Sequence, residues 1–200
     1  MKHIAPVACL ALGLAACSAP TVPDVTYYRL AEPAAAVWQR APSFPVPVDV
    51  AVFGADGLYA EQALIYSTDA GGTLRTYHYQ LWADPPARLL QRRLIDVLRR
   101  AQAAPLVTDR LPASADALRI TGLIRRFDRA RRADGFHAEI DLQLRVERSG
   151  RLLAEPVYHA DMLAQGTDLE ASVAAFGRAL DDVYARFLAD LAALDVGISR

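Results

Sequence analysis

The feature that most constrains the fold is a strict alternation of apolar and polar side chains between residues 136 and 147. The alternating residues are Phe136, Ala138, Ile140, Leu142, Leu144 and Val146, against His137, Glu139, Asp141, Gln143, Arg145 and Glu147. A period of two places the apolar side chains on one face of an extended strand and the polar ones on the other. The chain must therefore contain a sheet with one buried face and one polar face.

Further β-prone runs surround this strand. Asp69-Ala70-Gly71-Gly72 is a turn sequence typical of hairpins, and Ser149-Gly150 returns the chain toward an antiparallel partner strand. Pro47 favours a strand start or a sheet edge. The expected strands are residues 26–30, 46–53, 63–67, 73–82, 118–127 and 157–164, besides the alternating run.

Two segments have helical periodicity. The first opens at Asp84-Pro85-Pro86, with Asp84 as the expected N-cap and Pro85 in the first helical position, and it ends before Pro105. The second runs from Asp168 to Leu194, where apolar residues recur every three or four positions. We therefore expect an α+β fold in a single domain. Its sheet is largely antiparallel, with a middle helix and a long C-terminal helix packed on it.

The N-terminal segment predicts export and acylation. Residues 1–16 combine a basic start with an apolar run too short to span a bilayer, as in a signal peptide. The run ends in Leu14-Ala15-Ala16-Cys17, which resembles the bacterial lipobox at all four positions. Cys17 is therefore the expected lipidation site, carrying acyl chains such as palmitate. The alternative is an ordinary secretory signal followed by an incidental cysteine.

The residues after Cys17 predict where the mature chain resides. Ser18, and not Asp, follows the cysteine, and similarity to the sorting rule of enteric-type bacteria implies the periplasmic face of the outer membrane. Residues 17–45 are expected to form the lipidated cysteine and an extended Pro-rich tether. Residues 46–200 are expected to form the folded domain.

Composition excludes several function classes. Lys2 is the only lysine in the sequence, so the mature chain can form no Schiff base and has no P-loop lysine. Cys9 would leave with the signal peptide, so no internal disulfide is expected. The net charge of −1 at pH 7 gives no general case for nucleic-acid binding.

A catalytic, cofactor or metal motif is missing from the sequence. His78, His137 and His159 lie on expected strands, without a second His or Cys at metal-ligand spacing. Neither G-x-S-x-G nor H-E-x-x-H occurs. Asp181-Asp182 is expected on the solvated face of the last helix. We therefore expect no enzyme and no cofactor beyond the covalent lipid on Cys17.

Two groups of side chains remain as candidate contacts with a partner or with lipid. The first group comprises Arg125, Arg126, Arg129, Arg131 and Arg132. Clustered arginines suit anionic lipid headgroups or an acidic partner, although this run also fits the solvated end of a hairpin. The second group comprises Tyr77, Tyr79 and Trp82. These aromatic residues suit an interface, although packing in the core, on the middle helix, is the favoured explanation.

The order of motifs along the chain resembles a known family. After the lipobox come Tyr27-Tyr28-Arg29-Leu30, a Val-rich strand with Pro, the Tyr-containing run 58–66, and Trp82-Ala83-Asp84-Pro85 at a helix start. This order resembles the ABC-type transport auxiliary lipoproteins, the PqiC-like family, over nearly all of the mature chain.

The resemblance implies a non-catalytic accessory of an ABC/MCE-type lipid transport system. Such a protein resides on the outer membrane and works with an MCE-domain protein anchored in the inner membrane, and it can form a homo-oligomer. Two other interpretations remain open. One is a structural lipoprotein scaffold for outer-membrane assembly, and the other is a periplasmic lipid-binding carrier with its own pocket.

Overall fold

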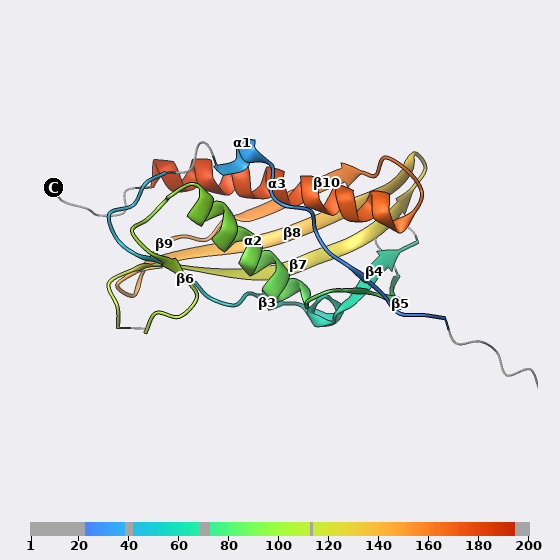
Figure 1. Ribbon diagram of the computed structural model, residues 1–200, viewed down its shortest axis with the longest axis horizontal. Coiled ribbons are helices and arrows are strands. Elements are labelled where there is room, and N and C mark those ends of the chain that lie inside the picture. The colour runs from blue at the N-terminus through green and yellow to red at the C-terminus, as the bar shows by residue number, and fades with distance from the viewer. Residues whose placement is uncertain (1–22, 39–41, 69–72, 113, 195–200) are drawn as a thin grey trace, which may run out of the picture.

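The computed structural model describes residues 23–38, 42–68, 73–112 and 114–194, which form a ten-stranded sheet with its helices on one face (Figure 1). A long antiparallel hairpin, β7 (Leu118–Arg132) and β8 (Gly135–Arg148), lies at the centre of the sheet. Strands β9 (Arg151–Ala154) and β10 (Val157–Leu163) pair antiparallel with the outer edge of β8. The alternating run therefore forms the strand it predicts, and β10 is the antiparallel partner expected near residues 157–164.

Three short strands follow one another along the other edge of β7. They are β2 (Val48–Val50), β3 (Gly54–Ala55) and β4 (Ala63–Ser67), and all three run parallel to β7. Between β3 and β4 lies the 3₁₀-helix η1 (Gly57–Ala60). The predicted α+β fold is confirmed. Its longest pairing, between β7 and β8, is antiparallel, whereas the short pairings of β2, β3 and β4 with β7 are parallel.

The remaining strands complete the sheet at its margins. Strand β5 (Leu74–Trp82) is antiparallel to β4, β1 (Thr26–Tyr28) is parallel to β5, and β6 (Val107–Thr108) is parallel to β2. The hairpin of β4 and β5 is confirmed, whereas its expected turn at residues 69–72 lies outside the described residues. Strand β7 extends five residues beyond the expected end at Phe127.

Helices α2 (Pro86–Arg100) and α3 (Leu169–Ala193) cover the apolar face, and the short α1 (Ala35–Trp38) contacts both of them. Helix α2 contacts β2, β3 and β7, whereas α3 contacts β8 and β10. The rings of Trp82, Phe127 and Phe176 meet between sheet and helix, with centroids 4.5 to 5.5 Å apart. The space under the helices is therefore filled by close aromatic packing.

The middle helix begins one residue later than expected. Pro85 is the N-cap and Pro86 is the first helical residue. Proline in this position has no N–H, so one donor that a cap would satisfy is absent. Asp84 instead pairs with Arg92 across the first turns of the helix, at 2.7 Å.

No helix among the described residues is long and apolar enough to cross a membrane.

The segment expected to be a tether joins the domain earlier than predicted. Thr26–Tyr28 adds a strand to the sheet, and Val37 and Phe44 are buried in the core. The amide of Phe44 donates to the carbonyl of Ala103 at 2.7 Å. The boundary at residue 45 is thus corrected, because these apolar side chains bury surface against the helices. Residues 1–22, with the expected signal peptide and Cys17, lie outside the described part of the chain.

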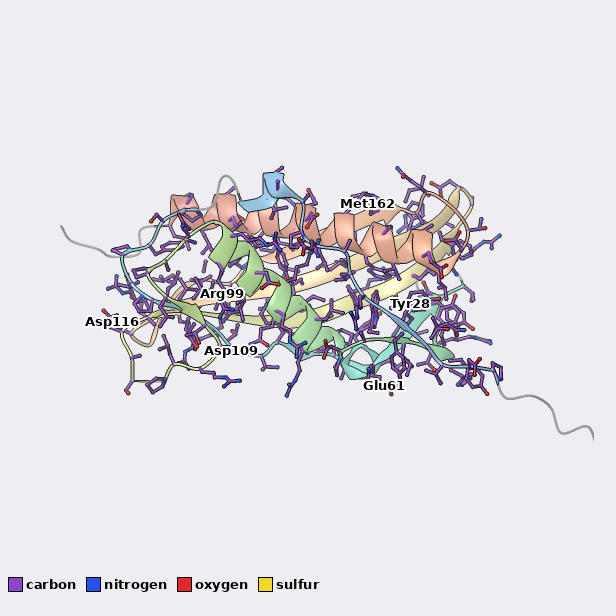
Figure 2. All side chains as sticks on the ribbon, viewed as in Figure 1. Tyr28, Glu61, Arg99, Asp109, Asp116 and Met162 are labelled. Carbon is purple, nitrogen blue, oxygen red and sulfur yellow. The ribbon has the colours of Figure 1, made fainter. Side chains whose placement is uncertain are left out.

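The chain enters the domain at one end of the sheet. Because β1 runs parallel to β5, the residues before Thr26 lead back toward the start of β5. We call this the N-terminal end; it also holds the turn between β7 and β8 and the start of α3 (Figure 1). The distal end holds β6, β9 and the turn at Ser149–Gly150. Tyr28 lies toward the N-terminal end, and Asp109 and Asp116 lie toward the distal end (Figure 2).

Candidate functional site

The five candidate arginines all lie on β7, where strand alternation divides them between the two faces of the sheet. A register shift between Ile124 and Arg126 leaves Arg125 at a bulge, where its side chain is exposed. Beyond the bulge, Arg129 pairs with Ala138 on the apolar face. The run is therefore no single basic patch, and each face has to be considered separately.

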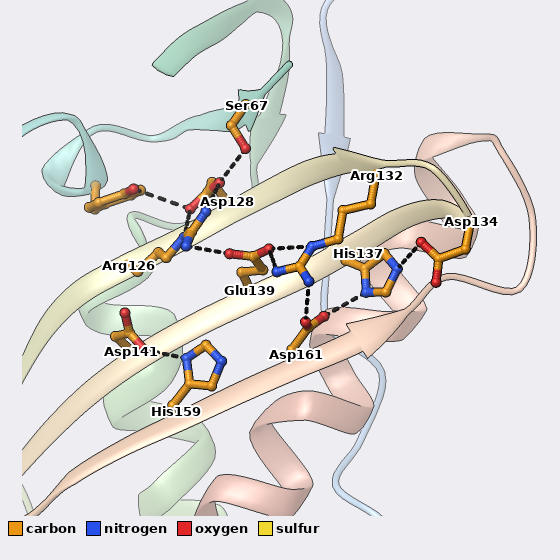
Figure 3. Close-up of polar contacts among 11 residues, drawn as sticks. Ser67, Arg126, Asp128, Arg132, Asp134, His137, Glu139, Asp141, His159 and Asp161 are labelled. Carbon is orange, nitrogen blue, oxygen red and sulfur yellow. Dashed lines mark hydrogen bonds and ion pairs between the residues drawn. The ribbon is translucent and has the colours of Figure 1, made fainter. Parts of the chain in front are cut away.

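On the polar face, two of the arginines are neutralised by buried carboxylates (Figure 3). Arg126 and Arg132 both form ion pairs with Glu139, which is 1% exposed. Arg126 also binds Asp128 at 2.8 Å, and Arg132 binds Asp161 at 3.0 Å. Hydrogen bonding to Glu139 raises the pKa of the Arg132 guanidinium. These two guanidiniums therefore hold β7, β8 and β10 together, a structural role that was not expected from the sequence.

Asp128 is the most deeply buried carboxylate of this face. It is fully shielded from solvent and accepts hydrogen bonds from the hydroxyls of Ser67, at 2.9 Å, and Tyr59, at 3.1 Å. Together with Arg126 these donors replace the lost hydration of the carboxylate. Burial and the neighbouring Asp128 charge raise the pKa of the Tyr59 hydroxyl above its ordinary value. The cluster thus links η1, β4 and β7.

The histidines of this face also bind carboxylates. The Nδ1 atom of His137 lies 2.6 Å from Asp161 and its Nε2 atom lies 3.0 Å from Asp134. This contact with His137 lowers the pKa of the Asp134 carboxyl. His159 contacts Asp141 at 2.6 Å. In the described part of the chain, His, Cys, Asp and Glu side chains form no group of three that could hold a metal ion.

On the apolar face, Arg129 is buried, and each of its three side-chain nitrogens donates a hydrogen bond. Its guanidinium donates to the Ser172 hydroxyl at 2.7 Å, the Tyr77 hydroxyl at 2.8 Å and the Thr167 carbonyl at 2.6 Å. It also stacks on the Phe136 ring, 3.3 Å from the ring centre. Arg129 therefore joins β7 to β5 and to the start of α3.

Arg131, two residues further along β7, is exposed beside an open cleft. Its guanidinium lies 4.8 Å from the centre of the Phe136 ring. The cleft has a volume of about 280 Å³, and its walls include Tyr66, Tyr77 and Arg129. We call it the basic cleft; it brings together two candidate arginines and one candidate tyrosine.

The three candidate aromatic residues of β5 separate by burial. Trp82 is 1% exposed, so its assignment as a surface contact is wrong. It ends the strand beneath α3, where Phe127 and Phe176 surround its ring. Tyr77 and Tyr79 are half-buried and line an open groove of about 600 Å³ along β5. Both rings are partly exposed in this groove, while the Tyr77 hydroxyl accepts the hydrogen bond from Arg129.

Two side chains have contacts in the structure that differ from those expected from the sequence. Asp181, expected in solvent, forms an ion pair with the buried Arg93 at 2.6 Å, because α2 and α1 cover this side of α3. Phe136 was assigned only to the core, yet it stacks with Arg129 and Arg131. Phe136 lies directly across the hairpin from Arg131, a pairing that only the register of β7 and β8 shows.

Comparison with known proteins decides the family. The family model of the ABC-type transport auxiliary lipoprotein component matches residues 28–187. The chain belongs to this auxiliary lipoprotein family. The resemblance inferred from the motif order is therefore confirmed, and the match includes both faces of β7. An auxiliary component of a transport system is consistent with a protein that is not an enzyme.

Solved structures share the fold of this auxiliary lipoprotein. Protein XCC0632 from Xanthomonas campestris, of the family designated DUF330, is 20% identical, with 84% of this chain and 95% of that one aligned and a TM-score of 0.71. The hypothetical protein CT253 from Chlamydia trachomatis is 7% identical, covering 78% of this chain and 100% of its own, with a TM-score of 0.55. At such identities the likeness shows the fold alone. No curated protein sequence matches the chain significantly.

Proposed function

We propose that this auxiliary lipoprotein is anchored by acyl chains on Cys17 to the periplasmic face of the outer membrane and docks an MCE-domain protein of an ABC-type lipid transport system. The family match over residues 28–187 supports the proposal, because it makes the chain an auxiliary lipoprotein component of an ABC-type transport system. Its part in that system is non-catalytic: it positions the partner at the membrane.

The position of the expected anchor orients the domain. Pro23, the first described residue, lies six positions after Cys17, and a fully extended chain over six positions spans at most about 20 Å. The chain then enters from the N-terminal end and pairs with Gln80–Trp82 of β5. The N-terminal end therefore lies close to the membrane, and the distal end points away from it into the periplasm.

The distal end offers a surface for a partner that approaches from the inner membrane. Leu106 and Leu152 are 48% and 46% exposed there. An open cleft of about 420 Å³ lies at the same end, with Asp116, Arg119 and Glu147 in its walls. Exposed apolar side chains beside polar groups are typical of protein interfaces. We therefore assign the docking of the MCE-domain protein to the distal end.

The interior packing argues against a lipid carrier. A carrier needs an apolar cavity that encloses its ligand. Here the space between sheet and helices is occupied by Trp82, Phe127 and Phe176, and by the Arg93–Asp181 pair between the helices. The accessory role therefore fits the described interior better than the carrier role.

A crosslinked pull-down tests the proposal. The full-length chain with a C-terminal tag is recovered from crosslinked membranes, beside a Cys17→Ser variant and an unrelated tagged outer-membrane lipoprotein. We expect an MCE-domain protein with the unmodified chain, and much less with Cys17→Ser, because loss of the anchor displaces the domain. Recovery of outer-membrane assembly components instead would favour the scaffold. Lipid that copurifies with the Cys17→Ser chain would favour the carrier.

A further inference from the structure

Three arginines gather on one face of the sheet at its N-terminal end. Across adjacent strands, Arg75 of β5 lies beside Tyr66 of β4, and Tyr66 lies beside Arg129 of β7. Residues paired in this way project from the same face. Arg131 follows two positions after Arg129 and therefore projects from that face too. Arg131 thus lines the basic cleft near the first turn of α3, and Arg75 lines the adjoining groove along β5, which shares Tyr66 and Tyr77 with the cleft.

The charges of these arginines are used differently. The guanidinium of Arg129 donates hydrogen bonds to three groups within the domain. The side chains of Arg75 and Arg131 are exposed, and within the described part of the chain neither guanidinium forms a hydrogen bond or an ion pair. Arg131 is held in place by its stacking on Phe136. Two cations are therefore available to an anion from outside, one of them already oriented by an aromatic ring.

Exposed apolar side chains accompany these cations at the same end. Val25 and Tyr27 are 47% and 60% exposed, and they lie where the chain enters the domain. Leu74 starts β5 at 36% exposure, and Leu163 ends β10 at 45%, opposite His137 near the β7–β8 turn. Basic residues mixed with aromatic and aliphatic ones are typical of surfaces that contact a bilayer interface.

We propose that the N-terminal end is a membrane-contacting surface and that Arg75 and Arg131 bind the phosphate of phospholipid headgroups there. Tyr66, Tyr77 and Phe136 form the walls of the cleft that receives the headgroup. The cleft volume of about 280 Å³ suits a headgroup and leaves the acyl chains in the bilayer. The short connection to Cys17 holds this end near the membrane, so the orientation rests on the proposed anchor, whereas the binding chemistry does not.

Vesicle binding by the non-acylated mature chain tests this proposal. Residues 17–200 with Cys17→Ser, exported through an ordinary cleavable signal peptide, are sedimented with vesicles of phosphatidylglycerol or of a neutral glycolipid without phosphate. We expect binding to the phosphatidylglycerol vesicles only. Each arginine near an anionic surface contributes about fivefold to the affinity. Arg131→Gln should therefore weaken binding about fivefold, and its combination with Arg75→Gln about 25-fold.

The matched control removes the same charge from the other end of the molecule. Arg151 is exposed on β9 at the distal end, so Arg151→Gln should leave vesicle binding unchanged. Equal losses for Arg131→Gln and Arg151→Gln would overturn the proposal, because only the net charge would then matter. Inorganic phosphate that binds the chain as tightly as the vesicles do would make a free anion the ligand and would also overturn it. The assay contains no partner protein, so either failure leaves the proposed transport role standing.

Discussion

The two faces of β7 use the same residue type for different purposes. On the polar face, Arg126 and Arg132 bind the buried Glu139, and their charges are cancelled within the domain. On the apolar face, Arg129 is buried among neutral acceptors, and Arg131 stays exposed on an aromatic ring. A cluster of arginines in the sequence is therefore not a basic surface when it lies on a strand. The residues across the hairpin decide what each arginine can bind.

The largest effect should come from the carboxylate at the centre of the polar face. Asp128→Ala leaves Arg126, Ser67 and Tyr59 without their shared acceptor, and removal of one partner from a buried ion pair costs about 3–5 kcal/mol. Urea unfolding measures this loss. The control is Asp116→Ala, whose carboxylate is 61% exposed beside Arg148 and should contribute far less to stability, because solvent screens an exposed ion pair. Similar losses in both variants would contradict the burial of charge on this face.

A smaller effect should separate the two arginines of the apolar face. Arg129→Met keeps apolar length over Phe136 but removes the charged hydrogen bonds to β5 and α3, which should cost about 2–4 kcal/mol. Arg131→Met alters an exposed side chain, and its unfolding free energy should stay within about 0.5 kcal/mol of the unmodified protein. The same urea experiment compares them. The contrast fails if Arg131→Met loses as much stability as Arg129→Met.

The smallest effect concerns the tyrosines buried on either side of the sheet. Burial is the largest cause that raises the pKa of both Tyr59 and Tyr184. The folded state holds these protons more tightly than the unfolded state does. Their contribution to the free energy of unfolding is therefore complete below the ordinary tyrosine pKa of about 10, and it is lost as the pH rises above that value.

A single substitution isolates one of these tyrosines. Tyr184→Phe removes the hydrogen bond to the Leu90 carbonyl, at a cost of about 1 kcal/mol near neutral pH. It should also make the decline of stability above pH about 10 shallower. Urea unfolding across this alkaline range measures both changes. An unchanged slope would show that Tyr184 keeps its proton equally in the folded and unfolded states.

Local periodicity made much of the fold predictable. The alternation over residues 136–147 and the apolar stripe of the last helix are both periodic patterns. A periodic pattern identifies a strand or helix even when its predicted ends are wrong by a residue or two. The parallel pairing of β1 with β5 has no such signal, because it joins residues more than fifty positions apart. For the same reason the packing of Val37 and Phe44 was mistaken for a tether.

The candidate site was only partly predictable. Arg131 and Tyr77 were named from their residue types, and both line the basic cleft. Phe136 was missed because the strand was expected to end at Phe127, so the register that places it opposite Arg131 was not available. Trp82 and Asp181 were misplaced because their burial depends on which helices cover them. Burial of this kind follows from tertiary packing and not from local pattern.

Paired photo-crosslinking in cells tests most directly whether the two ends have different partners. A photoreactive residue replaces Leu152 at the distal end in one acylated variant and Leu163 at the N-terminal end in another; both side chains are exposed. We expect the distal position to crosslink to an MCE-domain protein and the N-terminal position to phospholipid. Crosslinks of Leu163 to the MCE-domain protein, with lipid crosslinked at Leu152, would contradict both the orientation of the domain and the assignment of its two ends.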